Sequence, residues 1–150
     1  MANILSRLRR RGSADAIDTT PDDDANGLRQ AVGHFDRIID LYSEDPAFTR
    51  AVFVLTFEAV KTTSPIRGRI RDWLASGATT VEAGLRVGID DGSVRSDVDV
   101  DAATTDISTA GLGVAYHWVV FGDAYPLDRE LIKVQARVIR AYGARSGRRR

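Results

Sequence analysis

The sequence predicts an all-α fold, a helical bundle of about five main helices. Apolar residues recur at helical spacing in five segments, and turn-forming residues separate these segments. No segment alternates with a period of two, and no internal repeat appears. With 150 residues, of which 43% are hydrophobic, the chain is long enough to fold around one core.

The chain divides into three parts: a basic stub and acidic linker over residues 1–26, a helical domain over 27–143 and a basic tail over 144–150. Residues 13–24 have the composition of a poorly ordered linker. We expect the arginines at the two ends to lie on solvated tails. These arginines are Arg7, Arg9, Arg10, Arg11, Arg145, Arg148, Arg149 and Arg150.

The first two helices have clear signals. One apolar face begins near residue 27 with i, i+3, i+4, i+7 spacing and consists of Leu28, Ala31, Val32, Phe35, Ile38, Ile39 and Tyr42. Asp45 and Pro46 then form an N-cap and a first helical residue. The helix that follows is apolar nearly all round from Ala51 to Val60, so we expect it to be buried on most sides.

Three further helices follow. Ser64-Pro65 predicts the start of a long helix, and the pair Asp91-Gly92 predicts the turn that ends it. The next helix spans about 100–121. The segment GDAYPLD separates it from a last helix, in which Leu127, Leu131, Val134, Val138 and Ala141 form one stripe.

Aspartates crowd the run from Asp90 to Asp106, and some of them alternate like the first ligands of a calcium loop. Counted from Asp97, however, position six is Ala102 instead of glycine, and position twelve is Ser108 instead of a bidentate glutamate. Local hydrogen bonding explains the run better than a metal does. Asp99 is placed to cap the helix that follows, and Asp97 to pair with Arg95.

The sequence lacks the usual signals of several classes of protein. There is no cysteine, and the two histidines, His34 and His117, fall on different helices, so we expect no metal. No G-x-S-x-G elbow or glycine-rich phosphate loop is present, so we expect neither an enzyme nor a cofactor. The net charge is zero, whereas a dedicated nucleic-acid-binding domain usually has a basic excess or a basic face. With no cysteine, no apolar run of membrane length and no secretory signal, the chain is expected to be cytoplasmic.

The segment GIDDGSVRSDVDVDAA resembles the loop before the penultimate helix in regulators of the TetR family. Two other pieces are similar to that family: a glycine-containing segment with a tryptophan, AGLGVAYHWVV, and the apolar FVLTFEA. The resemblance covers roughly residues 28–142. Its residues are Gly88, Gly92, Arg95, Asp97, Asp99, Gly111, Gly113, Trp118 and Phe53–Ala59.

The resemblance implies a transcriptional repressor whose C-terminal all-α domain dimerises and binds a small hydrophobic effector. The family reads DNA with an N-terminal helix-turn-helix unit of about 40 residues, and the stub is shorter than this. We therefore expect the effector-binding half, with DNA contacted only through a reader outside this chain or through a heterodimer. A ligand sink, a heterodimerising modulator of a full-length regulator and an enzyme that reuses the pocket are the alternatives.

Aromatic residues and two polar ones are the candidates for the effector pocket, although an ordinary aromatic core would use the same residues. These candidates are Phe53, Phe57, Glu58, Trp73, Tyr116, His117 and Trp118.

In the TetR family the last two helices pair with their copies as a four-helix bundle, so we expect a homodimer here. Gly111 and Gly113 are unfavourable inside a helix unless another helix approaches closely. Beside its first stripe, the last helix carries a second one, which consists of Ile132, Gln135, Ile139 and Tyr142. The alternative to a dimer is that both stripes pack within the monomer. The interface candidates are Ser108, Gly111, Leu112, Ala115, Val119, Ile132, Gln135, Ile139 and Tyr142.

Overall fold

The computed structural model describes residues 25–61 and 65–144, and over these ranges the predicted all-α class is confirmed. Its helices are α2 (Gly27–Glu44), α3 (Pro46–Glu58), α4 (Pro65–Asp91), α5 (Val100–Phe121) and α6 (Leu127–Tyr142), with short 3-10 turns η1 (Ala59–Lys61) and η2 (Gly122–Ala124). Residues 1–24 of the predicted stub and linker, residues 145–150 of the predicted tail, and Ser64 lie outside the described ranges.

Capping side chains fix the starts of three helices, α2, α3 and α5. The Arg29 amide donates to Asn26 Oδ1 at the start of α2, and the Phe48 amide donates to Asp45 Oδ1 at the start of α3. Asp99 accepts from two backbone amides at the start of α5. The predicted starts at Asp45-Pro46 and at Asp99 are therefore confirmed.

The aspartate-rich loop connects α4 to α5 along the chain. Hydrogen bonds from this loop also hold the end of α4 beside the start of α2. Gly92 has a φ of +79°, which suits the turn predicted at Asp91-Gly92. Asp91 Oδ2 accepts from the Gly27 amide at 2.7 Å, and Ser93 Oγ accepts from the Leu28 amide at 3.1 Å. The predicted pair of Asp97 with Arg95 is present at 3.1 Å. Nowhere in residues 25–61 and 65–144 do three or more acidic or histidine side chains cluster as metal ligands would.

Small residues let α2 and α4 cross closely. A Cβ on Gly84 would lie 2.5 Å from the Ala31 nitrogen, and one on Gly27 would collide with the backbone of Gly88. The backbones therefore approach more closely than side chains would allow. This contact holds the end of α4 tightly against the beginning of α2.

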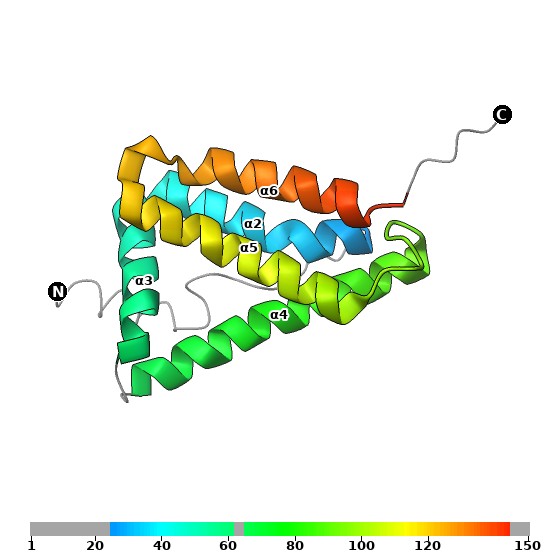
Figure 1. Cartoon of the computed structure of the whole chain (residues 1–150), viewed down its shortest axis with the longest axis horizontal. Coiled ribbons are helices and arrows are strands. Elements are labelled where there is room, and N and C mark those ends of the chain that lie inside the picture. Colours follow the sequence, from blue (N-terminus) through cyan, green and yellow to red (C-terminus); the bar gives the residue numbers. More distant parts are fainter. Residues whose placement is uncertain (1–24, 62–64, 145–150) are drawn as a thin grey trace.

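Away from that crossing, α4 diverges from α2 and α5, so that these three helices form a wedge. Helix α3 lies across the wide end of this wedge (Figure 1). Arg50 fixes α3 there, because its Nη2 donates to the Val119 carbonyl at 2.6 Å near the end of α5. A cation at this position also complements the helix dipole.

The expectation that α3 is buried on most sides was wrong. Its buried residues lie on the side that meets α2 and α5: Phe48, Thr49, Phe53 and Thr56. Val54 and, in the following turn, Val60 are exposed, because α3 covers one end of the wedge instead of crossing the core. Among the described helices, none has the length and apolarity needed to cross a membrane.

Candidate functional site: an apolar cavity between α4 and α5

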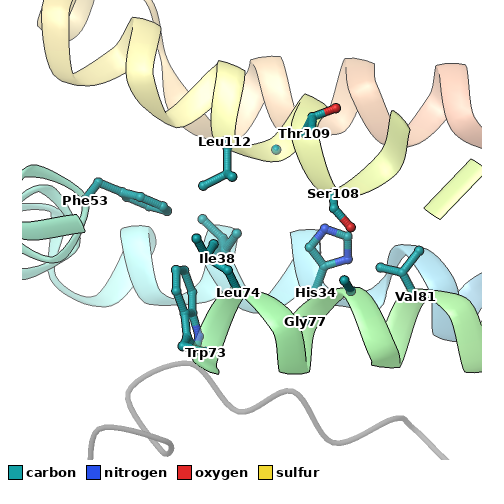
Figure 2. Close-up of a pocket in the computed structure, with 12 residues that line it drawn as sticks. His34, Ile38, Phe53, Trp73, Leu74, Gly77, Val81, Ser108, Thr109 and Leu112 are labelled. Atoms are coloured by element: carbon teal, nitrogen blue, oxygen red, sulfur yellow. The ribbon is translucent and has the colours of Figure 1, made fainter. Parts of the chain in front are cut away.

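A cavity of about 120 Å³ lies in the wedge (Figure 2). It is bounded by α2 behind, α4 and α5 on two sides, and Phe53 of α3 at the wide end. Because α4 packs closely against α2 at only one end, side chains fill the narrow part of the wedge and leave the wider part hollow. The lining residues are His34, Ile38, Phe53, Trp73, Leu74, Gly77, Ala78, Val81, Ser108, Thr109, Gly111 and Leu112.

The lining contains no lysine, arginine, aspartate or glutamate. Its two large aromatic rings, Phe53 and Trp73, lie toward one end, whereas His34 and Ser108 lie toward the other (Figure 2). Thr109 is polar, but its hydroxyl already donates to the Thr105 carbonyl at 2.8 Å. The cavity therefore offers an apolar volume with polar side chains at one end, which is the usual composition of a small-molecule site.

His34 is the titratable residue of the lining. Burial lowers the pKa of His34 to about 4, outweighing the Ala31 carbonyl and Asp36, which favour the protonated ring, while Arg37 opposes it. The buried Nδ1 has no hydrogen-bond partner, so the contact between the ring and the Ala31 carbonyl is electrostatic and lacks hydrogen-bond geometry. The imidazole is therefore neutral near pH 7.

Two of the seven predicted effector-binding residues, Phe53 and Trp73, line the cavity. Trp118 is buried in the core instead, edge-on to Tyr42 and Phe53. Phe57 packs between Phe53 and Tyr116. For Trp118 and Phe57 the structure matches the alternative of an ordinary aromatic core, whereas Tyr116 is exposed on α5.

The polar candidates lie away from the cavity. Glu58 is exposed and pairs with Lys61 at 2.9 Å. His117 is also exposed, and its Nδ1 lies 2.8 Å from the Gly113 carbonyl oxygen. Its ring stacks on Phe121 and lies against Tyr125, so it belongs to an aromatic cluster on the surface of α5.

Of the nine predicted interface residues, Ile132 is exposed. Gly111 and Ala115 face the interior, and a Cβ on Gly111 would lie 2.9 Å from Phe35 Cε1. The close approach predicted for Gly111 thus occurs within the monomer. The remaining candidates are partly buried: Ser108, Leu112, Val119, Gln135, Ile139 and Tyr142.

Gln135 and Tyr142 hold α6 against its neighbours. Gln135 Nε2 donates to Asp36 Oδ1 of α2 at 2.9 Å, and the Tyr142 hydroxyl donates to Asp106 Oδ2 of α5 at 2.8 Å. Burial and the Asp106 carboxylate raise the pKa of Tyr142 to about 12. Both side chains therefore connect helices of the same chain.

The exposed side of α5 has no charged residue from Ile107 to Phe121. We call Thr109, Gly113, Tyr116 and Val120, which are spaced i, i+4, i+7, i+11, the outer face of α5. Tyr116 and Val120 are 54% and 55% exposed, and nothing in the described chain lies within 4 Å of a Cβ on Gly113. This face is apolar and open to another helix.

Sequence reasoning missed His34 and Ser108 as lining residues. The spacing of His34 held a signal, because it lies one turn from Ala31 and one turn from Ile38 on the buried face of α2. Ser108 follows the buried Ile107 and gave no comparable signal. Its place in the lining depends on the divergence of α4 from α5, which no local pattern encodes.

No protein-family model matches the chain, and no match was found among curated proteins or solved structures.

Proposed function

We propose that this chain is the effector-responsive, dimerising domain of a transcriptional regulator of the TetR type. One observation carries the proposal: α5 lines an uncharged cavity on its inner side and presents an uncharged, exposed face on its outer side. The cavity would hold a small hydrophobic effector. The outer face would hold a second copy of the chain.

The chemistry of the lining supports binding of an apolar molecule. A ligand in this cavity exchanges water for contact with Ile38, Phe53, Trp73 and Leu112, which is favourable by about 25 cal/mol per Å² of apolar surface buried. Gly77 adds to the available space, because no atom lies within 4 Å of the position of its Cβ.

The composition of α5 supports a second copy as the dimer partner. Exposed apolar residues in one contiguous patch are typical of protein interfaces, whereas scattered ones are ordinary. Gly113 leaves room for a helix to approach the backbone, and Tyr116 and Val120 supply the apolar area. A symmetric pair would place the same face against itself, as most homodimers do.

The two surfaces share one helix, which gives the proposal its regulatory mechanism. Thr109 belongs to the outer face of α5 and also lines the cavity, and Leu112 lies one turn further along the same wall. A ligand that shifts α5 relative to α4 would change the contact between the two copies. Regulation then needs only that the ligand binds one dimer arrangement more tightly than the other.

Toluene is a suitable first probe for the cavity. We expect saturating toluene to raise the melting temperature of the unmodified chain, since a ligand that binds the folded state stabilises it. Gly77→Leu should abolish this increase by filling the cavity, whereas Gly68→Leu, on the same helix but outside the lining, should preserve it. The measurement is differential scanning calorimetry. The same increase in both variants, or none in the unmodified chain, would show that the cavity binds no such ligand.

A further inference from the structure

One end of the cavity is lined by two polar side chains that each carry an atom without a hydrogen-bond partner. His34 Nδ1 and Ser108 Oγ are both buried and unpaired within the described part of the chain. The Ser108 hydroxyl points toward the His34 ring (Figure 2). His34 Nε2 would lie 3.8 Å from a Cβ on Gly111, less than one turn after Ser108 on the same helix, so both polar side chains belong to one end. Leaving such a group unpaired costs about 1–3 kcal/mol.

The electrostatics of this end select an uncharged partner. The His34 imidazole is neutral near pH 7, because burial holds its pKa at about 4. No lining residue carries a charge, so a carboxylate or ammonium group at this end would have no counter-ion in the lining, which is unfavourable. A neutral imidazole and a hydroxyl can each donate and accept, so one neutral polar group on a ligand can satisfy both.

The size of the cavity limits the rest of the ligand. At about 120 Å³ it approaches the engineered apolar cavity of about 150 Å³ that admits benzene. The rings of Phe53 and Trp73 at the other end offer edges and faces against which an aromatic ring can pack. This volume limits the ligand to about one six-membered ring with a short substituent.

We propose that the cavity takes a single-ring apolar compound with one neutral hydrogen-bonding group, of the phenol or benzyl alcohol class, and that this group pairs with His34 and Ser108. The ring lies toward Phe53 and Trp73. This inference rests on the proposed function, because it specifies the effector that the cavity would bind.

Toluene, phenol and benzoate test the inference at pH 7, with dissociation constants measured by calorimetric titration. The quantity to compare between variants is the ratio of the toluene dissociation constant to the phenol dissociation constant. Water solvates the two compounds differently, but this difference is the same for every variant and cancels. His34→Leu and Ser108→Ala should each lower this ratio about 3- to 10-fold, the value of a hydrogen bond. Thr105→Val, on α5 but outside the lining, should leave the ratio unchanged, because the Thr105 hydroxyl donates to the Asp101 carbonyl.

A second readout needs no cavity variant. In the unmodified chain, phenol should move the imidazole ¹⁵N resonances of His34 and toluene should not. The chain has only two histidines, so a His117→Asn variant identifies the signals. Benzoate should bind more weakly than phenol.

The outcomes separate this inference from the proposed function. Toluene binding with a ratio that neither His34→Leu nor Ser108→Ala changes, and with unmoved ¹⁵N signals, overturns the inference alone. Benzoate binding more tightly than phenol also overturns it. If neither toluene nor phenol binds, the effector-binding function fails together with the inference.

Discussion

Among single residues, His34 lines the cavity and also makes the folded chain less stable at acidic pH. The folded chain keeps the ring neutral, with a pKa of about 4, whereas an unfolded histidine has a pKa of about 6.5. Because the lowered pKa belongs to the folded state, protons bind the unfolded state first as the pH falls. Stability is therefore lost between about pH 6.5 and pH 4, and no further below that range.

This difference gives a measurable pH dependence. Between pH 7 and pH 4.5 the unmodified chain should lose about 2 kcal/mol more free energy of unfolding than His34→Gln, whose side chain does not titrate. Urea denaturation at the two pH values measures these free energies. A loss in His34→Gln as large as that of the unmodified chain would mean that His34 is not a buried neutral ring.

At the scale of the helices, the crossing of α2 and α4 creates the wedge. Gly84→Ala would place a methyl group 2.5 Å from the backbone nitrogen of Ala31, so the two helices would have to separate. We expect a loss of about 1–3 kcal/mol in the free energy of unfolding. Gly33→Ala on α2 meets no atom within 4 Å and should instead gain up to about 1 kcal/mol of helix propensity.

Denaturant unfolding of the two glycine variants decides between these outcomes. A Gly84→Ala variant as stable as Gly33→Ala would contradict the close crossing. In that case the divergence of α4 from α5 would need another cause.

The same helices show how far the sequence predicts the fold. Local signals sufficed for the boundaries: Asp45-Pro46 begins α3, Asp91-Gly92 ends α4 and Asp99 begins α5. The face of each helix that meets a neighbour was harder to predict. The apolar sequence of α3 indicated burial on most sides, yet Val54 is exposed because α3 covers only the end of a wedge.

The candidate site was less predictable for the same reason. Phe53 and Trp73 were found because large aromatic rings often line pockets. His34 and Ser108 were missed, since their importance depends on the space between diverging helices. Trp118 was misleading, because an aromatic ring in a core and one in a cavity look alike in sequence.

At the scale of the whole molecule, α5 connects the cavity to the outer surface. Its inner side includes Ser108 and Leu112, and its outer face includes Gly113, Tyr116 and Val120. We propose that a ligand in the cavity changes how two copies of the chain associate through this outer face. By thermodynamic linkage, a ligand that alters dimerisation must also bind monomer and dimer with different affinity.

Sedimentation velocity of the unmodified chain, with and without saturating toluene, tests this claim most directly. We predict a dimer whose dissociation constant changes at least about 5-fold with toluene. Val120→Lys should sediment as a monomer, whereas Val87→Lys, at an exposed valine of α4, should still dimerise. If the chain is monomeric at every concentration, or if toluene leaves the dimer dissociation constant unchanged, α5 does not couple the cavity to dimerisation.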